Sequence, residues 1–167
     1  MTPGVQWLVA GGHWPTHAEQ SEQARRLLEQ LVGFHCIVKH NAAGAPRLPQ
    51  CPGLHVSISH CQAAVAVAVS DGAAVGIDVE ARRRVNPSLV QRVCNAEEQD
   101  FIHTSDDPEM AFLALWTRKE AVLKCRGTGI KGFGSMIDAL SDGGIEVQGL
   151  DCGLPDVVAA LAVAKGE

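Results

Sequence analysis

Three short apolar stretches follow one another between residues 55 and 79, and each has the length of a β-strand. In residues 55–60, valine and isoleucine alternate with two serines, so one face is expected to be apolar and the other to carry hydroxyls. Residues 63–69 are apolar throughout, which indicates a buried strand, and residues 75–79 follow a Ser-Asp-Gly turn. We expect these three strands to form a meander.

Two amphipathic helices are predicted around these strands. Residues 18–32 carry alanine, leucine and valine at helical spacing, and the helix is expected to stop at Gly33. Residues 106–126 begin with an aspartate cap followed by Pro108 and are expected to end at Gly127. Both helices can bury one face against a sheet.

The remaining elements repeat this order of a helix and then strands. A glycine-rich loop is expected after Gly127, and a turn is expected at residues 41–46. Further strands are expected at residues 5–10, 34–38, 136–140, 145–150 and 157–163, and short helices at residues 87–94 and 96–103. The pattern predicts an α+β protein of two similar small lobes, residues 1–75 and 76–167, that form one compact unit.

Composition and charge exclude several classes of protein. The chain has 167 residues, 46% of them hydrophobic, which is enough to bury a core. Its formal net charge of −5 argues against nucleic acid as a partner. No apolar run approaches the roughly 20 residues that cross a bilayer, and the first residues do not resemble a signal peptide. The six cysteines form no C-x-x-C pair, so we expect reduced thiols and a cytoplasmic protein.

Asp78 and Glu80 are two residues apart on a predicted strand, so their carboxylates project from the same face. Two adjacent carboxylates repel each other unless a cation lies between them, and Mg²⁺ commonly takes one or two carboxylates together with substrate phosphates. A solvated strand end explains the same two residues without any metal.

Trp116, Glu120 and Lys124 lie along one side of the predicted helix, each four residues after the last. A surface ion pair of Glu120 with Lys124 beside a core tryptophan accounts for this spacing equally well. Ser59 and His60 end a predicted strand, where the hydroxyl and the imidazole could donate to phosphate. A Ser-His-Asp nucleophile is also available, although no G-x-S-x-G turn supports it.

Three motifs in order resemble the signature of the 4′-phosphopantetheinyl transferases, in particular the larger monomeric type. They are S-I-S-H at residues 57–60, G-I-D-V-E at residues 76–80 and W-T-R-K-E-A-V-L-K at residues 116–124, and the resemblance covers residues 44–134. It implies a pseudo-two-fold pair of α+β lobes with coenzyme A bound between them. It also implies transfer of 4′-phosphopantetheine from coenzyme A to a serine of an apo acyl or peptidyl carrier protein, with release of 3′,5′-ADP.

The resemblance also assigns roles to individual residues. Asp78, Glu80 and Glu120 match the acidic residues around Mg²⁺, and Glu120 matches the proposed general base. Lys124 matches a lysine at the diphosphate, while Ser59 and His60 match residues that touch the phosphates of coenzyme A. Asp78, Glu120 and Lys124 are therefore the expected catalytic set.

The sequence departs from the family pattern before the serine–histidine motif. Ala45 stands where the family often has a basic residue, so Arg47 is our candidate to replace that contact. Arg25 and Arg26 on the first long helix are our candidates for the 3′-phosphate. The run Arg82-Arg83-Arg84, with Arg92, is either a solvated face or a docking surface for the carrier protein.

Two other functions fit the same residues. One is a different Mg²⁺-dependent enzyme that cleaves phosphate esters, such as a nuclease or phosphohydrolase. The other is a non-catalytic relative that binds coenzyme A or a carrier protein as a scaffold. From the family type and the two-lobe pattern we expect a monomer with no membrane partner.

Overall fold

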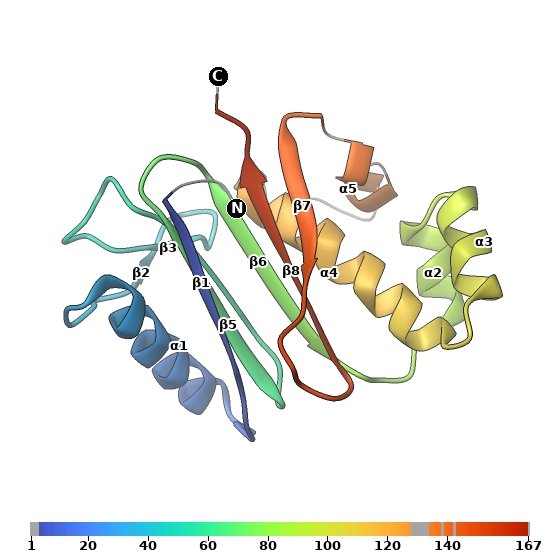
Figure 1. Ribbon diagram of the computed structural model, residues 1–167, viewed down its shortest axis with the longest axis horizontal. Helices are drawn as coiled ribbons and strands as arrows, with labels where there is room; N and C mark the ends of the chain where they lie inside the picture. The colour runs from blue at the N-terminus through green and yellow to red at the C-terminus, as the bar shows by residue number, and fades with distance from the viewer. Residues whose placement is uncertain (1–3, 128–133, 138, 142, 167) are drawn as a thin grey trace.

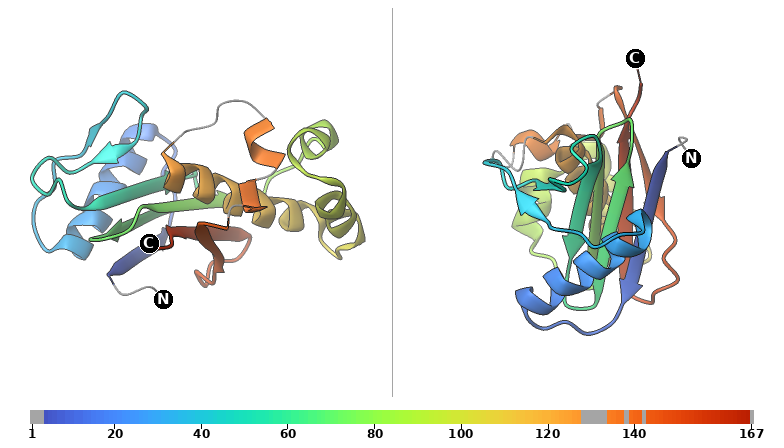
Figure 2. Two further views of the ribbon diagram at one scale, coloured as in Figure 1. Left: turned by 90° about the horizontal axis from the view of Figure 1, so that it is seen from above. Right: turned by 90° about the vertical axis from the view of Figure 1, so that its left-hand side faces the viewer.

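The computed structural model describes residues 4–127, 134–137, 139–141 and 143–166 and confirms an α+β protein. Its described residues contain two three-stranded antiparallel sheets and a small two-stranded hairpin, with helices on the outer faces of the sheets (Figures 1 and 2). The predicted glycine-rich loop falls largely on residues 128–133, outside the described part of the chain. None of the described helices is both long enough and apolar enough to cross a membrane.

The first sheet has the strand order β1-β5-β4 and is covered on one face by α1. α1 begins with a capping box between Thr16 and Glu19 and ends at Gly33, which adopts a left-handed conformation. A hairpin of two very short strands, β2 and β3, precedes β4. The elements of this half are β1 (Val5–Gly11), α1 (His17–Val32), β2 (Lys39–His40), β3 (Pro46–Arg47), β4 (His55–His60) and β5 (Ala64–Ser70).

The second sheet has the strand order β6-β8-β7, and α4 packs on one face of it. Asp107 caps the start of α4, and Gly127 ends it in a left-handed conformation. Two short helices, α2 and α3, pack beside the first turns of α4 (Figure 1). The elements of this half are β6 (Val75–Ala81), α2 (Pro87–Val93), α3 (Ala96–Thr104), α4 (Pro108–Arg126), α5 (Gly134–Ile137), the 3₁₀ turn η1 (Ala139–Ser141), β7 (Ile145–Leu150) and β8 (Val157–Ala164).

Between the two sheets lies a core to which β5 contributes only small side chains. Ala64, Ala66 and Ala68 of β5 pack against valines, isoleucine and leucine of β6 and β8, and all three alanines are fully buried. The valines that alternate with them, residues 65, 67 and 69, point to the other face and pack against α1. The strict alternation of alanine and valine therefore gives β5 a thin face towards the second sheet and a thick face towards α1.

Each half contains a strand, a long helix and two further strands in the same order, β1-α1-β4-β5 and β6-α4-β7-β8. The last strand lies in the middle of its sheet in both halves. This arrangement agrees with the expected repetition of elements, while the pseudo-two-fold relation and the lobe boundary at residue 75 stay predictions.

The predicted meander is wrong. β4 and β5 pair as expected, but β6 pairs with β8 in the other sheet. β5 is the central strand of its sheet, with β1 on one edge and β4 on the other, so it has no edge left for β6. Sequence neighbours alone could not reveal that β1 takes this edge.

Two other predicted strands are also absent from the described residues. Residues 34–38 are irregular, because the Cys36 amide donates to the carboxylate of Glu29 on α1 (3.0 Å) and has no strand partner. Residues 136–140 contain the end of α5 and part of η1. The carbonyls of Met136 and Ile137 accept from the Lys119 ammonium, which holds this segment in a turn.

Gly76 allows α4 to lie directly on β6. A methyl group added at Gly76 would come within 2.0 Å of the Ala121 carbonyl oxygen and 2.6 Å of the Cys125 amide nitrogen. Both are backbone atoms of α4 and cannot rotate away as a side chain could. The glycine at the start of the G-I-D-V-E motif thus sets the spacing between the strand and the helix.

We expect Gly76→Ala to lower the free energy of unfolding by about 3 kcal/mol or more, at or beyond the upper end of ordinary overpacking. Urea denaturation measures this change. Gly53→Ala is the matched control, because a methyl group there meets no atom within 4 Å. Equal stability of the two variants would contradict the proposed packing role of Gly76.

Candidate active site

The two sheets meet along β4 and β6, which belong to different sheets but lie alongside each other. Side-chain hydroxyls join them: Ser57 Oγ accepts from the Ile77 amide (2.9 Å) and Ser59 Oγ accepts from the Val79 amide (3.3 Å). Both serines are buried, on the face of β4 opposite the valine and isoleucine that pack towards α1. The predicted alternation of residues 55–60 is therefore confirmed, and its hydroxyl face forms the seam between the sheets.

Lys124 and Ser59 both bind the same oxygen of Asp78. The Ser59 hydroxyl donates to Asp78 Oδ1 (2.7 Å), and the Lys124 ammonium donates to it as well (2.8 Å). Lys124 also donates to the carbonyl oxygens of Ile77 (3.1 Å) and Ile58 (3.3 Å). The lysine therefore bridges β4 and β6, and its ion partner is Asp78 and not Glu120 as in a simple helix-surface pair.

The second oxygen of Asp78, Oδ2, is buried without a hydrogen-bond partner. Asp78 is 6% exposed, so water cannot replace the missing partner freely. Leaving a buried carboxylate oxygen unsatisfied is costly, which makes this atom an acceptor for a ligand or ion that the protein itself does not supply.

Glu120 is buried close to this carboxylate, and its proton affinity is strongly changed. Burial raises the pKa of Glu120 to about 7, and the charges of Asp78 and Glu80 add to the rise while Lys124 opposes it. Burial also raises the pKa of Glu80, against hydrogen bonds from Arg83 and Trp116. The charge of Asp78 raises the pKa of both Glu80 and Glu120. The three acidic groups therefore interact electrostatically, because β6 and α4, which carry them, pack against each other.

These residues fit a hard divalent cation held by few protein ligands. Among the described residues, no three or more His, Cys, Asp and Glu side chains converge as a ready metal site. Mg²⁺ does not need such a cage, because it takes one or two carboxylates and completes its shell with water and substrate phosphates. The unsatisfied Asp78 Oδ2 and the Glu120 carboxylate, whose pKa is raised by burial, are the groups that a cation would stabilise.

The other predicted site residues lie at different distances from this centre. His60 ends β4, where its ring packs edge-on against His17 at 5.1 Å, and burial lowers its pKa, helped by His17 and Lys124. Arg47 is exposed on β3. A hollow of about 150 Å³ beside Lys124 includes the predicted turn among its walls; it is lined by Ala43, Gly44, Ala45, Pro46, Val56, Ser57, Ile58, Lys124 and Gly127.

Arg25 and Arg26 pair with acidic residues of α1 and form no ion pair with Asp78, Glu80 or Glu120. Arg25 binds the carboxylates of Glu22 and Glu29, and Arg26 binds Glu22, all on α1. α1 covers the face of the first sheet opposite the two seam serines. Their predicted contact with the 3′-phosphate stays a prediction.

Lys119 has a structural role that the motif spacing did not predict. It is fully buried, and its ammonium donates to Glu98 Oε2 (2.7 Å), Val93 O (2.8 Å) and Met136 O (2.8 Å). The same Glu98 oxygen accepts from the Asn95 amide and so caps α3. Lys119 stands seven residues after Phe112 and four before Leu123, so a lysine within the apolar stripe of the helix was the available signal.

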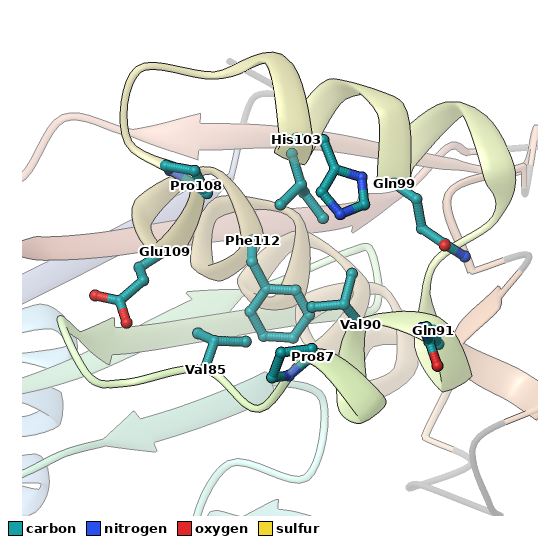
Figure 3. A pocket seen from close by; sticks show the side chains of 10 residues that line it. Val85, Pro87, Val90, Gln91, Gln99, His103, Pro108, Glu109 and Phe112 are labelled. Atoms are coloured by element: carbon teal, nitrogen blue, oxygen red, sulfur yellow. The ribbon is translucent and has the colours of Figure 1, made fainter.

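A larger hollow lies away from the carboxylates, between α2, α3 and the first turns of α4 (Figure 3). It has a volume of about 200 Å³ and is lined mainly by apolar side chains, with Phe112 at its base. Polar side chains of Gln91, Gln99, His103 and Glu109 stand around it (Figure 3). It contains none of the predicted catalytic residues.

The fold and the site together define a class: an α+β protein with an acidic, largely buried centre and a lysine at the junction of two sheets. A sequence profile of the 4′-phosphopantetheinyl transferase superfamily matches residues 74–158, which contain Asp78, Glu80, Glu120 and Lys124. The chain therefore belongs to the 4′-phosphopantetheinyl transferase superfamily.

Individual relatives agree with this assignment. The chain is 31% identical over 139 residues to the 4′-phosphopantetheinyl transferase AcpT of Escherichia coli K12, a match that covers 74% of this chain and 70% of AcpT. It is 36% identical over 111 residues to the 4′-phosphopantetheinyl transferase psf-1 of Bacillus pumilus, covering 65% of this chain and 47% of psf-1. The chain thus spans about half the length of psf-1. A third relative, 36% identical over 103 residues, is the fatty acid synthase subunit alpha of Penicillium patulum, and the match covers 58% of this chain and 5% of that protein.

The raised pKa of Glu120 predicts a pH-dependent cost in stability. The folded state keeps a proton that the unfolded state releases above its ordinary pKa of about 4.5, so stability falls as pH rises from there to about 7. We expect Glu120→Gln to be more stable than the natural protein at pH 8, by about 1–3 kcal/mol, with the gain vanishing towards pH 4. Urea denaturation in EDTA at both pH values measures it, with Glu146→Gln on the exposed part of β7 as the control. A gain independent of pH would contradict the assignment.

Proposed function

We propose that this chain transfers 4′-phosphopantetheine from coenzyme A to a serine hydroxyl of an apo carrier protein and releases 3′,5′-ADP. The observation that carries the proposal is the meeting of Asp78, Glu80, Glu120 and Lys124 around a buried carboxylate oxygen without a partner. Membership of the superfamily supplies the reaction type. The hollow beside Lys124 supports a position for coenzyme A along the junction of the two lobes.

Glu120 is the proposed general base. Its carboxylate is buried beside Asp78 and Lys124, in the position from which it can accept a proton from an incoming hydroxyl, directly or through water. The serine oxygen then forms a bond to the β-phosphorus of coenzyme A, the bond to the oxygen of 3′,5′-ADP breaks, and the serine proton ends on Glu120. Lys124 donates hydrogen bonds to the diphosphate and stabilises the negative charge that develops there.

Asp78 and Glu120 would hold Mg²⁺, with Glu80 directly or through water. When bound, the ion supplies charge stabilisation at the diphosphate. His60, at the end of β4, is proposed to donate to the phosphates. The Ser59 hydroxyl already donates a hydrogen bond to Asp78. Its main proposed role is therefore to orient this carboxylate, and its contact with coenzyme A is a secondary role. Arg47, Arg25 and Arg26 remain candidates for the nucleotide end.

Carrier proteins of fatty acid, polyketide or non-ribosomal peptide synthesis are the proposed acceptors. The fatty acid synthase subunit among the relatives supports an acyl carrier protein as one of them. We further propose that the chain acts as a monomer. We also propose a cytoplasmic location, which agrees with its six free cysteines.

Incubation with coenzyme A, Mg²⁺ and an apo carrier protein tests the transfer by mass spectrometry of the carrier. We expect a gain of one phosphopantetheine group, and we expect Glu120→Gln to slow it at least about 100-fold, the lower end of general-base contributions. Glu146→Gln on β7 is the matched control and should leave the rate unchanged. Hydrolysis of simple phosphodiesters without an acceptor would favour the phosphohydrolase alternative, and coenzyme A binding without transfer would favour the scaffold.

The docking of the carrier protein is proposed on the arginine run that follows β6. Arg82 binds Asp107 and Asp156 and so braces the fold, and Arg83 reaches Glu80 at 3.5 Å. Arg84 is exposed, and it stands next to Val85 at the wall of the apolar hollow of Figure 3. Arg84 is therefore the most suitable residue for a test of docking, because its substitution leaves the ion pairs of Arg82 and Arg83 in place.

We expect Arg84→Glu to raise the KM for carrier protein by about tenfold while the KM for coenzyme A stays constant. A charged residue at the edge of a docking surface affects the association of the carrier protein and leaves the binding of coenzyme A elsewhere unchanged. Steady-state kinetics with each substrate varied in turn measures both values. Lys165→Glu, directly after β8, carries the same change of charge and is the control. An equal KM for the carrier in both variants would remove Arg84 from the docking surface.

A further inference from the structure

In the resting protein, the ammonium group of Lys124 is bound entirely by oxygens of the chain itself. Its three protons have three acceptors, Asp78 Oδ1 at 2.8 Å, Ile77 O at 3.1 Å and Ile58 O at 3.3 Å. The side chain is 31% exposed, so it is partly withdrawn from water. One carboxylate and two carbonyl oxygens are also the kind of ligands that hard metal ions take. Lys124 thus places a cation on Asp78 before any ligand arrives.

The two oxygens of Asp78 are in different states. Oδ1 accepts from both Ser59 and Lys124, whereas Oδ2 is buried and has no partner. The Ser59 hydroxyl fixes which oxygen faces the lysine, because it is itself held by the Val79 amide. A divalent ion that approaches Oδ2 must therefore share one carboxylate with an ammonium, and the two positive charges repel each other across a short, poorly solvated distance.

A phosphate ligand can remove this repulsion. The ammonium of Lys124 is mounted on a flexible four-carbon chain, so it can turn from Asp78 towards a nearby phosphate oxygen. Asp78 then loses its internal cation and becomes a stronger ligand for an external one, and the phosphate oxygens are added to the ligands available.

We propose that Lys124 is an internal counter-cation of Asp78 that keeps the affinity for divalent cations low until a phosphate-bearing substrate draws the ammonium away. The inference rests on the function proposed above and adds to it an order of events at the same site. Cation and substrate bind with positive coupling, and by thermodynamic reciprocity each raises the affinity of the other by the same factor.

Titration with Mn²⁺, followed by the electron paramagnetic resonance of the free ion, tests this without any transfer reaction. We expect Lys124→Met to bind Mn²⁺ about tenfold tighter than the natural protein in the absence of substrate, within the usual range of coupling between sites. Lys165→Met is the matched control for the loss of one positive charge and should bind as the natural protein does. Adding Asp78→Asn to Lys124→Met should abolish the gain.

A second variant and a second measurement protect the test against a failure to fold. Lys124→Gln keeps an amide that can donate to the carbonyls of Ile58 and Ile77, and circular dichroism verifies the fold of each variant. In the natural protein, coenzyme A should tighten Mn²⁺ binding by a similar factor. The inference is overturned if folded Lys124 variants bind Mn²⁺ no tighter than Lys165→Met, if the gain survives Asp78→Asn, or if coenzyme A leaves Mn²⁺ affinity unchanged.

These outcomes are separate from the fate of the proposed function. Transfer of phosphopantetheine with unchanged Mn²⁺ affinity in the Lys124 variants would retain the function and remove the counter-cation. Tighter Mn²⁺ binding in those variants, together with no transfer by the natural protein to any carrier, would remove the function and retain the counter-cation.

Discussion

The backbone contact between α4 and β6 at Gly76 is the constraint on which the site depends. Because glycine has no side chain, the Ala121 carbonyl and the Cys125 amide of the helix lie against the strand itself. Glu120 and Lys124 flank this contact on α4, and Asp78 follows it on β6. A wider spacing would separate the lysine from Asp78 and from the two carbonyls that it bridges. Gly76 thus brings the charged groups of the G-I-D-V-E motif on β6 together with those of the W-T-R-K-E-A-V-L-K motif on α4.

Local patterns predicted most of the secondary structure, because each element contains its own signals. The ends of α1 and α4 follow from Gly33, Pro108 and Gly127, and the face of β4 follows from the alternation of serine with valine and isoleucine. Two of the three failures share one cause, which is a partner distant in the sequence. The meander failed because β1 occupies the second edge of β5, and the strand at 136–140 failed because Lys119 binds its carbonyls.

The site itself was only partly predictable. Motif spacing brought Asp78, Glu80, Glu120 and Lys124 to attention; in the structure Lys124 pairs with the buried Asp78, whose charge also acts on Glu80 and Glu120. Spacing could not say that Lys124 pairs with Asp78 in preference to Glu120, which lies one turn away on the same helix. That choice depends on the carbonyl oxygens of Ile58 and Ile77, and no side-chain pattern records the position of a carbonyl.

The thin alanine face of β5 determines how closely the two halves approach each other. Ala64, Ala66 and Ala68 are the smallest chiral side chains, and they separate the first sheet from β6 and β8. A larger residue in this layer would push the first sheet, and β4 with it, away from β6. The width of the junction between β4 and β6 therefore depends on single methyl groups in the interior. Substitutions in this layer would therefore change the width of the proposed substrate junction while its charged residues stay the same.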